Sequence, residues 1–347
     1  MVLMTILFLV LLACILTHSQ LSLSYAGMGL ELWFRNMIPS LMPFMILSGI
    51  MIRMGLTDKA AMIAYPVVRP VYKVRKNVCY AMLMGFLCGF PMGARVVDDL
   101  YRRRMITGRE AEYLLAFCNN IGPVYFCSFV LPLLGRKLVF PYLFGMYGLP
   151  LLYGLLLRYT AYRDIPRPDT AFTGKLPFLE KGLSIEKKLS WKKGASTGDR
   201  PEGPLISCEK KTSKGLSGAG SLGERFLAEA DDSVQAAVQA MLALGGYMVL
   251  YNILNLIPHI ILGHPLKWIS PLLEITGGLK LLGGGAPLYS LLALSFGGLC
   301  CIAQTYNCIG DSDLSMGKYL WHKIILTLLN GLFYFCWFQS SPSSFLR

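Results

Sequence analysis

Two stretches of the sequence place glycine, proline and polar side chains inside apolar segments. The first is Gly89 to Arg95 (Gly-Phe-Pro-Met-Gly-Ala-Arg), and the second is Asn119 to Pro123 (Asn-Asn-Ile-Gly-Pro). Both interrupt a helix, and unwound backbone at membrane depth exposes N–H and C=O groups that lipid cannot satisfy. Such backbone persists only inside protein or beside a wet cavity, which is where transporters bind substrate. These stretches are therefore the first candidates for a binding site.

Arg95 is the candidate anion-binding side chain. Helix N-termini opened near Gly93 carry unpaired N–H groups and partial positive charge, which favour an anion. The planar guanidinium can donate two parallel hydrogen bonds to a carboxylate. Two structural alternatives stay open. In the first, the residues of the break only allow close helix contact, namely Pro91, Gly93 and Ala94. In the second, Arg95 only anchors the hairpin at the cytoplasmic interface.

Asn119 and Asn120 are the candidate polar groups of the second break. They would either line a substrate site or close a polar network between helices. The Gly122-Pro123 step that follows favours the first interpretation, because the proline also frees a carbonyl on the previous turn.

Glu274 is an ionisable group in a short, otherwise uncharged apolar segment, which is functional by default at membrane depth, with exposure at the interface as the alternative. We expect it to pair with Arg95 or to carry a coupling proton. Gln304, Thr305 and Asn307 follow a second glycine break and are the counterparts of Arg95. The predicted substrate-binding residues are Gly89, Pro91, Gly93, Arg95, Asn119, Asn120, Gly122, Pro123, Glu274, Thr276, Gln304, Thr305 and Asn307.

The composition is that of an integral membrane protein. Of the 347 residues 54% are hydrophobic and only 15% are charged, against roughly 25% charged in soluble domains. The net charge of +13 must lie in loops and ends, where excess Lys and Arg mark the cytoplasmic side and contact anionic lipid. Nucleic-acid binding is disfavoured, because no soluble module interleaves basic and aromatic residues.

Neither a metal site nor a catalytic site is predicted. The ten cysteines contain no Cys-x-x-Cys pair, so buried small hydrophobes are the default. Cys300, Cys301 and Cys308 lie far from His259 and His264, and the spacing matches no common zinc site. The sequence also has no phosphate loop and no Ser/His/Asp set. We therefore expect no cofactor and no enzymatic activity.

The two interrupted segments also carry a family resemblance. The run from Gly89 to Arg95, with Asp99-Leu-Tyr, Ile106 to Glu112 and Phe117 to Pro123, resembles the YlbJ-type sporulation integral membrane proteins, within the wider Gate or nucleoside-recognition group. The similarity continues at 39–44, 273–277 and 296–298. The resemblance implies a role in sporulation and the movement of dipicolinic acid into the developing spore, while the wider group keeps nucleosides as an alternative.

The order of apolar segments predicts an all-α, polytopic membrane protein of two inverted repeats, each with a re-entrant hairpin and a broken transmembrane helix. The hairpins are expected at 78–94 and 288–309, among six full spans. The predicted parts are a transmembrane anchor at 1–25, a first Gate-like repeat with its connecting helix at 33–160, a disordered basic linker at 161–228, a second repeat at 229–338 and a tail at 339–347.

Charge bias places the termini and the linker in the cytoplasm, with the protein in the cell membrane or the forespore membrane. The predicted function is transport of a small anionic solute by alternating access. The alternatives are a nucleoside transporter and a non-transporting membrane scaffold whose linker recruits a sporulation partner. A coupling ion or proton and homo-oligomerisation stay open.

Overall fold

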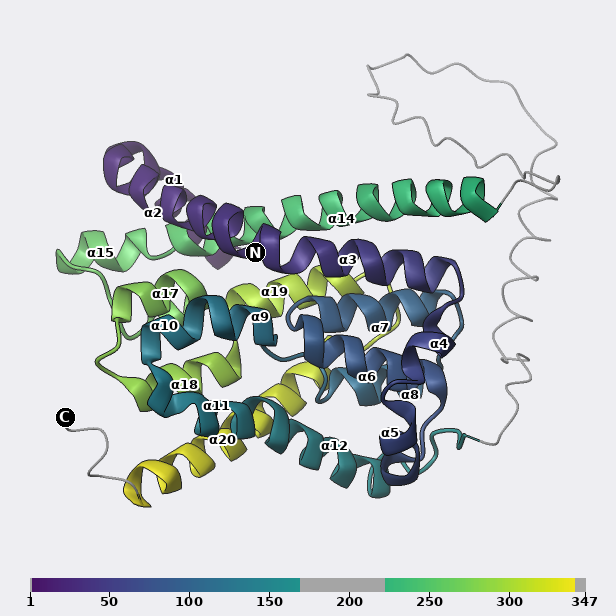
Figure 1. Cartoon of the computed structure of the whole chain (residues 1–347). Helices are drawn as coiled ribbons and strands as arrows, with labels where there is room; N and C mark the ends of the chain where they lie inside the picture. The colour runs from purple at the N-terminus through teal and green to yellow at the C-terminus, as the bar shows by residue number, and fades with distance from the viewer. Residues whose placement is uncertain (1, 169–221, 341–347) are drawn as a thin grey trace, which may run out of the picture. The chain divides into compact units, whose positions relative to one another are not determined.

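The computed structural model describes residues 2–168 and 222–340, and these form helices joined by turns, with no strand among them (Figure 1). This confirms the all-α prediction. Most of the predicted linker and of the C-terminal tail lies outside the described residues. The linker prediction meets described residues at two places. At 161–168 the chain forms turns in which Tyr162 and Ile165 are buried. At 222–228 it is already part of helix α14 (Leu222–Ile253).

The N-terminal helices differ from the expected pair of spans. Helix α1 (Val2–Thr17) ends before His18, and α2 (Ser19–Leu32) continues through a π-helical turn (Trp33–Met37) into α3 (Ile38–Arg53). The boundary expected near Tyr25 does not exist, because the helix continues through Gly27 and Gly29, and Gly29 packs against α14. A Cβ on Gly29 would lie 3.0 Å from the carbonyl oxygen of Met248.

The first helical hairpin lies where the sequence predicts it. Helices α6 (Lys76–Cys88) and α7 (Met92–Arg102) pack against each other on either side of Gly89-Phe90-Pro91. The break predicted at Asn119 is also present, between α8 (Gly108–Leu115) and α9 (Pro123–Tyr125).

The remaining elements of this half are α4 (Thr57–Ala61), α5 (Tyr65–Tyr72), a π-helical turn (Phe126–Val130), α10 (Leu131–Leu134), a 3-10 turn (Arg136–Leu138), α11 (Val139–Leu143), a second π-helical turn (Phe144–Gly148) and α12 (Leu149–Tyr159).

The second half places its hairpin earlier than expected. Helices α16 (Ser270–Leu273) and α17 (Ile275–Leu282) pack against each other around Glu274. The segment expected to be a hairpin instead forms α18 (Pro287–Phe296) and α19 (Gly298–Ile309), two helices separated by Gly297. The other elements are α14, α15 (Leu256–Leu262) and α20 (Met316–Ser340), which is unbroken because it contains no proline.

Four helical runs are long and apolar enough to cross a membrane, namely Ser19–Arg53, Arg136–Tyr159, Phe226–Leu262 and Pro287–Ile309. The protein is therefore a multi-pass membrane protein. The prediction had six full spans. The 16 residues of α1 fall short of the roughly 20 that a span needs, the Asn119 break divides another segment, and Lys323 and Asn330 interrupt the apolar run of α20.

The first long helices of the two halves run side by side in opposite directions (Figure 1). Tyr25 shares a 2.8 Å hydrogen bond with His259, and the Trp33 indole donates one of 2.8 Å to the Met241 carbonyl. Further along α3, the Arg53 guanidinium lies 3.1 Å from the Asp232 carboxylate. Because the partner number falls as the residue number rises, α2 and α3 are antiparallel to α14 and α15.

The last long helices of the two halves are paired in the same way. The ring centroids of Phe140 and Trp337 are 5.0 Å apart, and those of Phe144 and Phe333 are 4.7 Å apart. At the other end of the pair, the Tyr153 hydroxyl shares a 2.7 Å hydrogen bond with His322. Helices α11 and α12 are therefore antiparallel to α20.

Thr107 and Glu110 form a capping box at the start of α8. The Glu110 backbone N–H donates to the Thr107 hydroxyl over 3.3 Å, and the Thr107 N–H donates to the Glu110 carboxylate over 2.7 Å. Glu110 is fully buried and also forms an ion pair with Arg75. The cap therefore fixes a buried carboxylate at the helix that leads to the Asn119 break.

Thr107→Ala should destabilise the protein by about 1 kcal/mol, the usual cost of losing a side-chain cap. The measurement is the melting temperature of the purified protein in detergent. Thr160→Ala is the matched control, because that hydroxyl is exposed and only donates back to the Leu156 carbonyl of its own helix. Equal melting temperatures for the two variants would contradict a role for the cap.

Candidate functional site

The tip of the first hairpin is pressed against the first helix break. The Phe90 N–H donates a 2.7 Å hydrogen bond to the Asn120 carbonyl. Gly89 has φ of +77°, and a Cβ there would lie 2.2 Å from the backbone nitrogen of Gly122. Only glycine allows this backbone conformation and this approach. The hairpin and the broken helix therefore form one unit, held through main-chain atoms.

A second helix break lies close to a second pair of packed helices. Gly298, at the break between α18 and α19, also has a φ of +77°, and a Cβ there would lie 3.1 Å from the Pro271 carbonyl oxygen of the α16–α17 hairpin. The second break also approaches the tip of the first hairpin, because a Cβ on Gly297 would lie 3.0 Å from the Phe90 ring.

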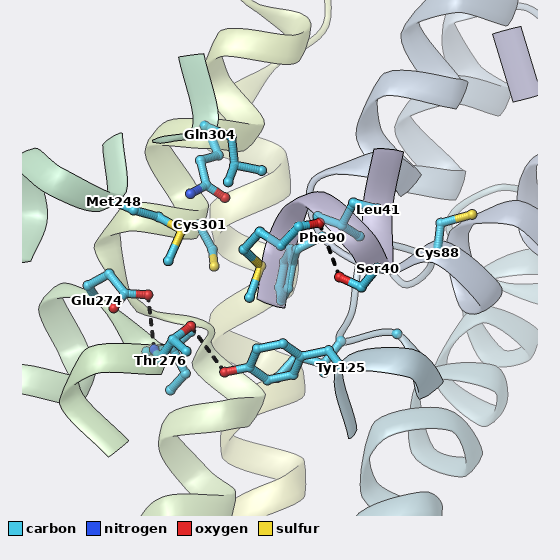
Figure 2. A pocket seen from close by; sticks show the side chains of 15 residues that line it. Ser40, Leu41, Cys88, Phe90, Tyr125, Met248, Glu274, Thr276, Cys301 and Gln304 are labelled. Carbon is cyan, nitrogen blue, oxygen red and sulfur yellow. Dashed lines mark hydrogen bonds between the residues drawn. The ribbon is translucent and has the colours of Figure 1, made fainter. Parts of the chain in front are cut away.

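A cavity of about 50 Å³ lies between the two hairpin-and-break units. Figure 2 shows Glu274 and Thr276 of the second hairpin on one side and Tyr125 of α9 on the other, with Phe90 above Tyr125 in this view. The Tyr125 hydroxyl donates a 3.1 Å hydrogen bond to Thr276 across the cavity. The lining residues are Met37, Ser40, Leu41, Cys88, Phe90, Ile121, Gly122, Tyr125, Leu244, Met248, Glu274, Ile275, Thr276, Cys301 and Gln304.

Glu274 is buried and accepts hydrogen bonds from three donors. Its carboxylate oxygens accept from the backbone N–H groups of Thr276 (2.9 Å) and Gly277 (2.6 Å) and from the Asn252 amide (3.2 Å). Glu274 thereby caps the N-terminus of α17. An ionised carboxylate suits this place, because it only accepts hydrogen bonds and because the helix dipole favours negative charge there.

Four of the predicted site residues line this cavity, namely Gly122, Glu274, Thr276 and Gln304. Gly89 and Pro91 form the hairpin tip, and Pro123 is the first residue of α9. Gly93 packs against the second stretch, since a Cβ there would lie 3.1 Å from the Asn119 side-chain oxygen. Its N–H is already bonded to the Gly89 carbonyl at 3.0 Å, so it is not the free anion-binding group that the sequence suggested.

Arg95 does not pair with Glu274, so this part of the prediction is wrong. Its guanidinium donates a 3.2 Å hydrogen bond to the Ala236 carbonyl of α14. It lines two smaller depressions, one with Asp99 and the other with Asn307. The reason is its position on α7, one turn beyond the hairpin tip, which carries the side chain away from the main cavity.

Asn119 and Asn120 hold the break in place from inside the protein. The Asn119 amide donates to the Thr305 hydroxyl (3.0 Å) and to the Tyr319 hydroxyl (3.3 Å), which join the two halves. The Asn120 amide donates to the Phe117 carbonyl at 2.6 Å. Both residues are buried and neither lines the cavity. The structure thus places them as supports of the site.

Asn119→Ala should lower thermal stability modestly, by about 1–2 kcal/mol, because it removes two hydrogen bonds that each contribute about 1 kcal/mol or less in membranes. The protein should stay inserted, and its melting temperature in detergent measures the change. Asn307→Ala is the matched control, because Asn307 is exposed. A melting temperature unchanged by Asn119→Ala would contradict this supporting role.

Lys323 is the functional candidate that the sequence interpretation missed. It lies in α20, is 4% exposed, and its ammonium group is 3.4 Å from both the Asn119 carbonyl oxygen and the Asn120 side-chain oxygen. It also lies 4.2 Å from the centroid of the Phe90 ring. The rule that singled out Glu274, an ionisable residue within an apolar segment, applies equally to Lys323 and would have found it.

The comparison with known proteins agrees with a membrane protein of this kind. The chain is 33% identical over 118 residues to the sporulation integral membrane protein YlbJ of Bacillus subtilis (strain 168). The aligned part covers 34% of this chain and 29% of the length of YlbJ. The homology is distant and partial. No protein-family model matches the chain, and no solved structure does.

Proposed function

We propose that this protein transports a small anionic solute across a membrane. The observation that carries the proposal is a cavity in a multi-pass membrane protein, lined by the turns of both helical hairpins, by the first helix break, by α19 and by the long helices α3 and α14. Secondary transporters bind substrate where interrupted helices meet, because unwound backbone there supplies polar groups that lipid cannot satisfy.

The helix order supports two inverted repeats. Each half has a long helix, a hairpin, a broken helix and a last long helix, in the same order. The first long helices are antiparallel to each other, and so are the last. Two halves with one order and opposite directions are related by an axis in the membrane plane, which is the arrangement of inverted-repeat transporters. The hairpins are then re-entrant, and the two units would move against each other.

The family resemblance favours an anion, and the Lys323 ammonium lies 4.2 Å from the centroid of the Phe90 ring in the cavity wall. The matched protein is named as a sporulation integral membrane protein, and the family resemblance implies dipicolinic acid (pyridine-2,6-dicarboxylic acid) as the solute. The cavity of about 50 Å³ has room for only a few water molecules. This conformation is therefore a closed one, and entry of an aromatic dicarboxylate requires the two units to separate.

Uptake into proteoliposomes that contain the full chain tests this function, with labelled dipicolinic acid, labelled uridine and empty liposomes compared. Uptake of dipicolinic acid supports the proposal, uptake of uridine alone supports the nucleoside alternative, and uptake of neither supports a non-transporting scaffold. Thr276→Val removes a hydroxyl from the cavity wall and should slow uptake. The same change at exposed Thr160 should leave uptake as it is.

A further inference from the structure

Lys323 is a buried cation without an anionic partner. Within residues 2–168 and 222–340, no carboxylate lies within 4.0 Å of its ammonium group. Its two oxygen contacts, with the Asn119 carbonyl and the Asn120 amide, are both 3.4 Å long, beyond the usual length of such bonds. Burying a charge with so little compensation is costly. An anion beside Lys323 would remove that cost.

Glu274, the carboxylate of the cavity wall, is not available as a partner for Lys323. Both of its oxygens accept hydrogen bonds, from the two backbone N–H groups at the start of α17 and from Asn252. A carboxylate satisfied in this way has no need of a further cation. Glu274 and Lys323 therefore have separate partners, and Lys323 is the one whose hydrogen bonds are long.

Phe90 connects Lys323 to the cavity. Its ring lines the cavity, and the Lys323 ammonium lies 4.2 Å from the ring centroid. Cation and aromatic face attract each other at this distance. Figure 2 shows the Phe90 side chain in the middle of the cavity wall. A movement of this one ring, at the tip of the first hairpin, would place the ammonium group against a bound solute.

We propose that Lys323 is the residue that binds the carboxylate of the transported solute. This rests on the proposed transport function and refines it, because it names the recognised group as a carboxylate and moves the cationic residue from Arg95 to Lys323. The Phe90 ring covers the ammonium group when the site is empty. When solute enters, its carboxylate replaces the ring and the long contacts with Asn119 and Asn120.

The test compares pyridine-2,6-dicarboxylate with its neutral analogue pyridine-2,6-dicarboxamide, which has the same ring and outline. Lys323→Met should weaken binding of the dicarboxylate roughly tenfold or more, the effect of losing one charge-assisted hydrogen bond. Binding of the diamide should change less than about twofold. Lys318→Met is the matched control on the same helix, since Lys318 is half exposed and pairs with Glu112.

A second variant and a measurement on the wild-type protein test the proposal even if Lys323→Met does not fold. Lys323→Gln keeps a polar side chain and should show the same selective loss. For the wild-type protein in detergent, a saturating concentration of the dicarboxylate should raise the melting temperature more than the diamide does, since a ligand stabilises the state it binds.

The outcomes separate the two proposals. A dicarboxylate affinity that is the same in wild type and Lys323→Met, with uptake intact in both, overturns the role of Lys323 and leaves transport standing. The variants could instead lose affinity for the dicarboxylate and the diamide equally, with both compounds raising the melting temperature of the wild type equally. Lys323 would then be a structural residue, and this result also overturns the assignment. A wild-type protein that takes up neither the dicarboxylate nor uridine overturns the proposed function itself.

Discussion

Gly89→Ala should abolish transport and destabilise the protein by roughly 3 kcal/mol or more, combining the penalty for a left-handed non-glycine residue with that of overpacking. The new Cβ would lie 2.2 Å from the Gly122 nitrogen and 2.8 Å from the Asn120 carbonyl oxygen. Both neighbours are main-chain atoms, so no side chain can rotate away. The hairpin tip and the helix break would have to separate, which also removes the hydrogen bond from Phe90 to Asn120.

Gly55 provides a control with the same backbone requirement and no crowding. Its φ is +68°, and nothing lies within 4 Å of a Cβ placed there. Gly55→Ala should therefore cost only the conformational penalty of about 1 kcal/mol. Melting temperature and proteoliposome uptake measure both variants. If Gly55→Ala and Gly89→Ala lower the melting temperature equally, the close contact between tip and break is not what requires glycine.

Glu274→Gln should destabilise the protein by roughly 2–4 kcal/mol and stop uptake. All three of its partners are donors. Glutamine offers one acceptor and one NH₂ group, so at least one buried donor would face another donor and lose its partner. The start of α17 would also lose the negative charge that its dipole favours. Glu274→Asp keeps the charge on a shorter side chain and should be intermediate.

Glu31→Gln is the control for this change. Its carboxylate is 48% exposed and pairs only with Arg35, four residues along the same helix. Exposed pairs of this kind contribute about 0.5 kcal/mol or less, so stability and uptake should be close to wild type. A Glu274→Gln protein as stable and as active as Glu31→Gln would show that the donors around residue 274 do not need a carboxylate.

The breaks in the first half were predictable because glycine and proline fix local backbone geometry. Gly89, Pro91 and the Gly122-Pro123 step lie where the helices end. The second hairpin was not found, because α16 has only four residues and a segment that short shows no helical period. Its turn contains no proline. Glu274 ends one helix and caps the next, a role that becomes visible only with its three donors in place.

The site residues also divide into those placed by local sequence and those placed by packing. Gly122, Glu274, Thr276 and Gln304 line the cavity, and each lies at or near a break between helices. Arg95 does not line it, because its direction depends on how α7 packs against α14, and sequence spacing does not give that orientation. The sequence interpretation missed Lys323, because lysines near the ends of apolar segments usually place their ammonium groups in water.

In a transporter of the proposed kind, the antiparallel pairing of the long helices bears on which side of the membrane the empty protein faces. If the halves were identical, an axis in the membrane plane would exchange the inward-open and outward-open states, and the two would have equal free energy. Any resting preference for one side must then come from residues without an equivalent in the other half. Lys323 on the unbroken α20 and the amide pair at 119–120 are such residues. Under the proposed function, the differences between the two halves, rather than their similarity, would set which side of the membrane the empty protein faces.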